Sequence, residues 1–398
     1  MPDGSFLKLR PMVPRRRDEK HRVATPLELF FDLVFVVAVS FASAQLHQSE
    51  SSEHIASGVG TYLMVFFAIW WAWVNFTWFA SAFDTDDWLY RLLTLVQMGG
   101  VLVLAAGTVP AMTDSDFTLV TLGYVVMRLA LVPQWLRAAR SDPDLRPTAM
   151  RYAIGVTLVQ ILWVLRLALP EEWGTVSFLV LVAAELSVPV VAERVRATPW
   201  HPEHIAERYS LFTLIVLGES ILASANSIVD AVEHTDHLGS LVVIAVCGLV
   251  LAGGMWWVYF HTEHGGVLAG MSSALLFGYG HYVVFAAAGA FSAGIEVAID
   301  HDTHATGLTA ATAAATLTVP VAIFLLGSWF LTMRGRLPRG TGIAVVVLSV
   351  LIGASALAPA SLVVAAVLIA VLVAVLVATS AGSSSAEAKA TDTSTSGW

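Results

Sequence analysis

Apolar stretches recur along almost the whole chain, and short polar segments separate them. A helix that crosses the hydrocarbon core of a membrane needs about 20 mostly apolar residues, and about twelve stretches reach that length. Their approximate limits are residues 26–47, 55–83, 87–109, 117–139, 148–169, 173–194, 203–230, 238–260, 272–299, 308–333, 342–357 and 360–379. The last two are separated only by Ala358-Pro359, and the eleventh is short. The pattern predicts an all-α fold, a polytopic helical membrane protein with about twelve transmembrane helices.

Parts of this pattern occur twice. Glu28 is followed by an aromatic and apolar run in the first span, and Glu207 is followed by a similar run in the seventh. The second span contains Trp70-Trp71-Ala72-Trp73, and the eighth contains Trp256-Trp257. Because these offsets are roughly 180 residues, we expect two six-helix halves, 26–194 and 203–379, related as a parallel 6+6 pseudo-repeat. The alternative is that aromatic runs recur by chance in membrane helices.

The charged residues outside the spans predict the orientation of the chain. With the N-terminus in the cytoplasm, the tails and the even-numbered connections hold Lys and Arg, whereas the outer connections hold no Lys or Arg and carry acidic residues instead. This positive-inside pattern predicts a protein of the inner (cytoplasmic) membrane with both termini cytoplasmic. Residues 1–25 are a basic tail without the apolar core of a cleavable signal peptide. Residues 380–398 are rich in Ser, Thr and Ala, which predicts a disordered tail.

Composition limits the classes of function. Of the 398 residues, 57% are hydrophobic and 13% are charged, against about 25% charged in a soluble domain. The single cysteine, Cys247, excludes a disulfide framework. The chain contains no Walker motif, dinucleotide fingerprint or nucleic-acid-binding stripe. The expected partners are therefore the lipid bilayer and a small molecule or ion, with no nucleic acid, and the oligomeric state stays open.

Two carboxylates lie one helical turn apart in the first span. A charge at that depth costs roughly 2.5–3.5 kcal/mol on insertion scales, so Glu28 and Asp32 need local partners or a function. Glu28 has an ordinary explanation, because Thr25 as N-cap and Pro26 at the first helical position complete a capping box with it. Asp32 lies about 9 Å beyond the helix start, where capping does not explain it. We expect Asp32 to belong to a site or to a specific buried pair.

The seventh span also carries ionisable residues. His204, Glu207 and Arg208 lie in its first two turns, with His204 and Arg208 on one face. They could be ordinary interface charges or part of a site. Glu219 lies near the middle of the bilayer, and Gly218 before it would allow another helix to approach closely.

Deep polar residues occur in three further spans, at Arg128, Glu185 and His281. An arginine at that depth must pair, so we predict an ion pair between Arg128 and a carboxylate, with Glu219 slightly preferred over Glu185. This pair could be structural or part of a polar path. His281 could titrate near neutral pH, or it could simply be hydrogen-bonded.

Two kinds of short motif could carry chemistry. Asp84-Thr85-Asp86-Asp87 is similar to the acid motif of class II terpene cyclases, but it also fits the start of a helix, with Arg91 one turn further on. Four H-x-x-H pairs have a spacing that can bind a metal ion, namely His201/His204, His234/His237, His261/His264 and His301/His304. Because most of them lie in predicted loops or at span ends, we interpret them as solvated histidines, and we expect no cofactor.

Several stretches together resemble the bacterial low temperature requirement A (LtrA) family. They are Pro26 to Val36, Phe83 to Asp87, Arg91-Leu92-Leu93 with Gln97-Met98, Tyr124 to Arg128, and Glu207-Arg208 through Leu217-Gly218-Glu219-Ser220. The resemblance covers spans one to ten and implies a multi-pass inner-membrane protein. It implies no particular chemistry, because the family name reports a growth phenotype.

Three functions remain open. The first is a transporter or channel for a small solute or protons, whose path would use Asp32, Arg128, Glu185, His204, Arg208, Glu219 and His281. The second is a membrane-embedded enzyme acting on a lipid or isoprenoid such as a prenyl diphosphate, with Mg²⁺ as cofactor. Its catalytic residues would be Glu28, Asp32, Asp84 and Glu207. Its aromatic second span could stabilise carbocations, unless those rings form an interfacial belt. The third is a stress-related membrane protein without turnover, in which buried charges only pair helices.

Overall fold

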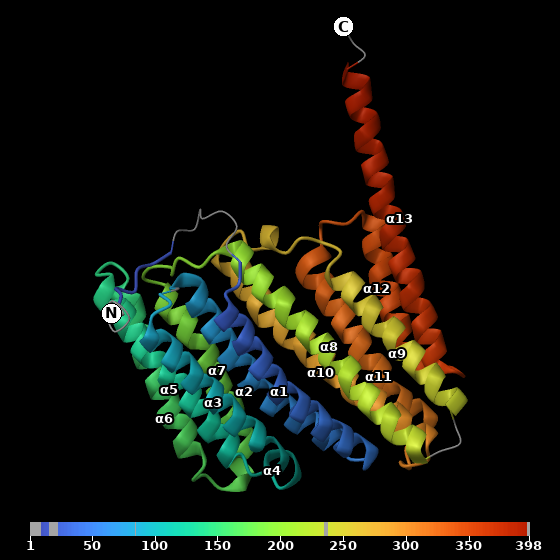
Figure 1. The fold of residues 1–398 in the computed structure, drawn as a ribbon, viewed down its shortest axis with the longest axis horizontal. Helices are drawn as coiled ribbons and strands as arrows, with labels where there is room; N and C mark the ends of the chain where they lie inside the picture. Colours follow the sequence, from blue (N-terminus) through green and yellow to red (C-terminus); the bar gives the residue numbers. More distant parts are fainter. Residues whose placement is uncertain (1–8, 16–22, 84, 235–237, 396–398) are drawn as a thin grey trace, which may run out of the picture. The chain divides into compact units, whose positions relative to one another are not determined.

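The fold is seen in a computed structural model of the chain (Figure 1), which describes residues 9–15, 23–83, 85–234 and 238–395, with the backbone alone for 227, 230–234 and 382–395. Regular structure within these residues is helical, and no strand occurs among them. The long helices are α1 (Pro26–Ser51), α2 (Ile55–Ala82), α3 (Trp88–Ala106), α5 (Thr118–Ser141), α6 (Arg146–Arg166), α7 (Gly174–Glu193), α8 (Pro202–His234), α9 (Leu238–Tyr259), α10 (Met271–Asp302), α11 (Ala310–Ser328), α12 (Arg339–Ala354) and α13 (Ser361–Thr395). The short elements are α4 (Thr108–Thr113), η2 (Glu171–Trp173), η3 (Gly265–Val267), the π-helical turn η4 (Trp329–Met333) and η5 (Ser355–Leu357).

The predicted number of spans is confirmed. Across the described residues, twelve helical stretches are long and apolar enough to cross a membrane. The last two, for which the sequence evidence was weakest, are Arg339–Leu357 and Ser361–Ala381. The third ends at Ala106, earlier than predicted, because the chain turns at Gly107 into α4. The protein is thus an all-α, multi-pass membrane protein.

The helices form two compact units. The first contains the chain up to Leu46, then Ile55–Ile215 and Leu268–Leu275, and the second contains His47–His54, Val216–Val267 and the chain from Leu276 onward. The division falls inside α8 and not between the predicted halves 26–194 and 203–379. Since the units are defined by packing and not by symmetry, the 6+6 repeat stays a prediction.

In the first unit, α5 packs against α3 and α6, and α6 packs against α7 (Figure 1). Two glycines allow α3 and α5 to approach closely. A Cβ atom on Gly123 would lie 2.4 Å from the backbone nitrogen of Leu104, and one on Gly100 would lie 2.8 Å from the carbonyl oxygen of Gly123. Such small residues are typical of helix contacts in membranes. They help to place Arg128, five residues after Gly123, inside the unit.

The interior of the first unit is built around α2. Trp70, Trp71 and Trp73 are at most 2% exposed. The alternative that this aromatic run forms an interfacial belt is therefore wrong for these three rings.

In the second unit, α13 packs against α9 and α12, and α11 packs against α12. There α11 continues into η4, where the chain widens for one π-helical turn before Gly335 (φ +77°) reverses its direction.

Candidate functional site

Helix α2 contacts two separate groups of buried charged side chains in the first unit. Trp73 Nε1 donates a hydrogen bond to Asp32 Oδ1 (2.7 Å), and Trp71 Nε1 donates one to Glu185 Oε2 (3.0 Å). Residues two apart on a helix point in widely different directions, so each tryptophan serves a different group. The sequence pattern predicted neither role for these indoles.

The first group consists of Glu28 and Asp32 from α1 with His204 and Arg208 from α8, and we call it the Asp32 cluster. Arg208 Nη2 lies 2.5 Å from Asp32 Oδ1, Arg208 Nε lies 3.2 Å from Asp32 Oδ2, and Arg208 Nη1 lies 2.9 Å from Glu28 Oε1. All four residues are buried, with Glu28 the most exposed at 2%. Asp32 thus belongs to a specific buried ion pair, one of the two outcomes expected from the sequence.

Glu28 has two roles at once. Its Oε2 accepts hydrogen bonds from the Thr25 backbone amide (2.8 Å) and the Thr25 hydroxyl (2.9 Å), and its own amide donates to Thr25 Oγ1 (3.3 Å). This confirms the predicted capping box. Its other oxygen faces Arg208 and His204, so capping alone does not account for Glu28.

His204 is the fourth member of the cluster. Its Nε2 lies 3.2 Å from Glu28 Oε1, and its backbone amide donates to Nδ1 of His201 (3.4 Å). Both histidines are buried. The prediction that the His201/His204 pair is solvated is therefore wrong, because the start of α8 enters the interior of the unit instead of lying in a loop.

The charges of the Asp32 cluster do not balance when His204 is neutral. Two carboxylates then face one guanidinium. A further ionisable neighbour among the described residues is Glu207, which is half-buried, accepts a hydrogen bond from the Ala24 amide (3.2 Å) and adds no positive charge. An uncompensated charge is costly to bury. One bound proton, shared between His204 and the carboxylates, removes the excess, so the arrangement is chemically suited to proton binding.

The second group is the pair formed by Arg128 of α5 and Glu185 of α7, with 3.1 Å between Nη2 and Oε2. An Arg128–carboxylate pair was predicted, and it is confirmed. The prediction that Glu219 is the preferred partner of Arg128 is wrong. The position of a residue along its span indicates its depth in the membrane but not which helices are neighbours. In the structure, α6 packs against both α5 and α7 and so brings Glu185 close to Arg128.

Neutral donors complete the surroundings of Glu185. Besides Trp71, Gln160 Nε2 (2.8 Å) and Trp163 Nε1 (3.3 Å) donate to its Oε1. Arg128 and Glu185 are at most 1% exposed. Nε and Nη1 of Arg128 have no hydrogen-bond partner within the described part of the chain. Charges of one plus and one minus balance here without a proton, in contrast to the Asp32 cluster.

Glu219 belongs to the second unit and is half-buried, and it makes no hydrogen bond or ion pair with the side chains that the structure describes there. Among the described atoms of that unit, none lies within 4 Å of a Cβ built at Gly218.

His281 is fully buried in the second unit and has partners for both ring nitrogens. Nδ1 lies 2.6 Å from the Phe277 carbonyl oxygen, which only accepts, so Nδ1 carries the proton. Nε2 lies 2.9 Å from the Tyr259 hydroxyl oxygen. Because both ring nitrogens are hydrogen-bonded, this geometry favours the simpler alternative of a hydrogen-bonded core histidine.

The acidic segment between α2 and α3 acts as a helix start. Asp84 lies outside the described residues. Asp87 is the N-cap of α3, accepts from the Tyr90 amide (2.9 Å) and pairs with Arg137. Desolvation opposes ionisation, but these hydrogen bonds and the charge of Arg137 hold the pKa of Asp87 below its usual value. Asp86 pairs with Arg91 (2.7 Å). The helix-start interpretation is confirmed for Asp86 and Asp87.

A cluster that the sequence analysis missed lies at the other end of α1, in the second unit. His47 Nδ1 lies 3.1 Å from Glu296 Oε2, His47 Nε2 lies 2.7 Å from Asp300 Oδ2, and the Ser51 hydroxyl donates to that same oxygen (2.6 Å). The signal was available, because Glu296 and Asp300 are four residues apart and therefore share a helix face. What was not available was that the end of α1 packs against α10.

The remaining histidine pairs do not assemble a metal site. His264 is buried, and its Nε2 donates to the Tyr259 carbonyl oxygen (2.9 Å), so the solvated interpretation is wrong for it too. Burial lowers the pKa of His264. The pair His234/His237 lies outside the described side chains. Among those that are described, no group of three or more His, Cys, Asp or Glu residues is arranged to hold a metal ion.

Comparison with known proteins now places this architecture. The model of the bacterial low temperature requirement A protein (LtrA) family matches residues 23–381. The chain belongs to the LtrA family. A relative in Rhizobium meliloti (strain 1021), the uncharacterized protein RA0937, is 29% identical over 270 residues, which span 65% of this chain and 63% of the relative. The match confirms the resemblance carried by the first-helix and seventh-span motifs, and all four residues of the Asp32 cluster lie inside the matched region.

Proposed function

We propose that this LtrA-family protein is a proton-coupled transporter for a small solute, with the Asp32 cluster as its proton site. The observation that carries the proposal is the excess of one carboxylate over guanidinium in a cluster at most 2% exposed. A buried group whose charge balances only when a proton is bound has two states, and ionisable residues inside membranes often serve as proton relays. The Arg128 pair supplies a fixed, balanced element in the same unit.

Orientation is part of the proposal. The positive-inside rule assigns the connections that carry basic residues to the cytoplasm. Examples of these residues are Arg137 near the end of α5, Arg194 after α7 and Arg334 after η4. We therefore propose that the protein lies in the inner membrane with both termini in the cytoplasm. Single cysteines introduced at Glu172 and Arg194, with Cys247 replaced by Ala, test this. Only the first should react with an impermeant maleimide added outside intact spheroplasts.

Transport itself is tested with proteoliposomes that contain the pH dye pyranine. A panel of amino acids, sugars, organic cations, organic anions and inorganic ions is added outside, with and without an imposed membrane potential. At least one class should move protons with the wild-type protein. Asp32→Asn should abolish this movement, whereas Arg194→Gln, at an exposed position, should not change it. No proton movement with any class under either condition would contradict the proposal.

The enzyme hypothesis keeps one supporting observation. Aromatic rings adjoin the Asp32 carboxylate: Trp73 binds it directly and packs against Phe212 (4.5 Å between centroids) and Tyr209 (4.9 Å). Such rings can stabilise a carbocation. However, Arg208 binds both oxygens of Asp32, so neither oxygen is left without a protein partner to face a substrate. Incubation of the purified protein with prenyl diphosphates of several chain lengths, with and without Mg²⁺, distinguishes the two functions.

A further inference from the structure

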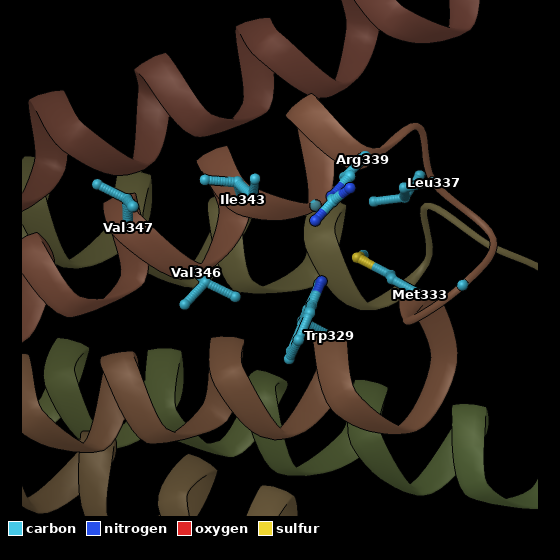
Figure 2. A pocket seen from close by; sticks show the side chains of 9 residues that line it. Trp329, Met333, Leu337, Arg339, Ile343, Val346 and Val347 are labelled. Atoms are coloured by element: carbon cyan, nitrogen blue, oxygen red, sulfur yellow. The ribbon is translucent and has the colours of Figure 1, made fainter.

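An apolar pocket of about 410 Å³ lies in the second unit where η4 meets the start of α12 (Figure 2). We call it the Trp329 groove, after its main lining residues Trp329, Met333, Arg339, Ile343, Val346 and Val347. Figure 2 shows Trp329 and Met333 from η4 on one side and the branched side chains of α12 on the other. The π-helical turn of η4 displaces Trp329 and Met333 relative to a regular helix, and such turns are frequent at functional sites.

One end of the groove carries Arg339, and two further arginines precede it in the sequence. Arg334, Arg336 and Arg339, the last of which is the first residue of α12, lie within six residues that include no acidic residue. Arg336 donates to the Glu263 carbonyl oxygen (2.6 Å), and the guanidinium of Arg334 lies 5.3 Å from the centre of the Phe330 ring. Arg339 lines the groove, is exposed and makes no hydrogen bond or ion pair with another described residue. Its donors are therefore available to an anion.

The groove also has a defined position in the span. Arg339 is the first residue of the eleventh spanning stretch, and Ile343, Val346 and Val347 follow it over the next two turns. The charged end therefore lies at the level of lipid headgroups and the apolar part extends into the hydrocarbon region. Trp329 lies beside the charged end, where tryptophan is typically found.

We infer that the Trp329 groove binds an anionic phospholipid, with the phosphate at Arg339 and Arg334 and an acyl chain along α12. Charge complementarity selects this ligand, because a zwitterionic lipid gains less from a groove that is lined by Arg339 and preceded in the sequence by Arg334 and Arg336. The site is independent of the proposed transport function, since it shares no residue with the Asp32 cluster.

Native mass spectrometry of the purified protein tests this, with dioleoylphosphatidylglycerol, dioleoylphosphatidylcholine and sn-glycerol 3-phosphate as probes. A basic residue near a membrane surface contributes about 1 kcal/mol, which is about a fivefold change in Kd. Arg339→Gln should weaken phosphatidylglycerol binding about fivefold, and the double change with Arg334→Gln about 25-fold. Neither should affect phosphatidylcholine. Val346→Trp, which fills the groove, should weaken both lipids.

Controls separate the alternatives. Arg194→Gln, an exposed arginine at the end of α7, should leave lipid binding unchanged, and Arg339→Lys should restore most of it. Unfolding temperatures of all variants show whether they fold. Equal binding of both lipids, or unchanged binding by the Arg334/Arg339 double variant, would overturn the inference. Displacement of the lipid by glycerol 3-phosphate would also overturn it and would indicate a site for free phosphate esters. A dimer that only Val346→Trp dissociates would overturn it as well and would assign the groove to a second copy of the chain.

Discussion

The Asp32 cluster and the Arg128 pair use the same chemical groups in the same unit, yet they differ in charge balance. The pair has one carboxylate and one guanidinium, and its carboxylate accepts three further bonds from neutral donors. The cluster has two carboxylates for one guanidinium and an imidazole beside them. The difference teaches that a buried charge is not by itself evidence of function. A balanced pair can be structural, whereas an unbalanced cluster requires a proton or a ligand.

The largest effect is expected at the arginine on which the cluster depends. Arg208→Gln leaves Glu28 and Asp32 buried without a permanent cation, and breaking a buried pair in this way costs about 3–5 kcal/mol. The free energy of unfolding in mixed micelles, measured by SDS titration, checks this. Arg194→Gln should stay within about 0.5 kcal/mol of the wild type. A loss below 1 kcal/mol for Arg208→Gln would mean that the cluster is already neutral without Arg208.

The Arg128 pair should behave as a replaceable structural element. Arg128→Met alone leaves the Glu185 charge uncompensated and should cost about 3 kcal/mol. Adding Glu185→Gln removes that charge but keeps a carbonyl acceptor for Trp71, Trp163 and Gln160. The double variant should therefore recover to within about 1–2 kcal/mol of the wild type in the same unfolding assay. If it recovers nothing, the pair has a role beyond charge compensation.

Isosteric neutralisation separates the two groups most clearly. Asp32→Asn leaves Glu28 to balance Arg208, so it should cost only about 1–2 kcal/mol, the value of its charge-assisted hydrogen bonds, while it abolishes solute-driven proton movement. Glu185→Gln should do the reverse, with a larger loss of stability and proton movement retained per folded molecule. Both properties are measured on the same preparations by SDS titration and pyranine fluorescence. Loss of proton movement in both variants would make the comparison between the groups untenable.

The smallest effect is expected at Asp87, which lies outside the spans. Its pKa is held below the usual value, so its contribution to stability is present above about pH 4, the ordinary value for aspartate, and is lost as the pH falls through the lowered pKa. Asp87→Asn keeps the N-cap but removes the charge facing Arg137, and should cost less than about 1 kcal/mol at pH 7. Unfolding measured from pH 7 to pH 3 should show this difference shrinking. A difference that persists at pH 3 would assign the effect to the cap and not to the charge.

Local sequence patterns predicted much of what the structure contains. Hydropathy located the spans, since about 20 apolar residues suffice to identify each. The capping box at Thr25 and Glu28 and the helix start at Asp87 are also local, because their partners lie within three residues. The pairing of charges was not local. Arg208 and Asp32 are 176 residues apart, and Arg128 and Glu185 are 57 apart.

The sequence by itself therefore determined the class of protein and the presence of buried ionisable residues. The reason is that each helix must satisfy its own backbone hydrogen bonds and present apolar side chains in the hydrocarbon core of the membrane. Only the tertiary structure decided which of these residues meet. It paired Arg128 with Glu185 and not with Glu219, joined His204 and Arg208 to α1, and brought His47 between two carboxylates. The physical reason is that depth in a membrane fixes one coordinate of a side chain, whereas the neighbouring helix depends on small-residue packing such as that of Gly100 and Gly123.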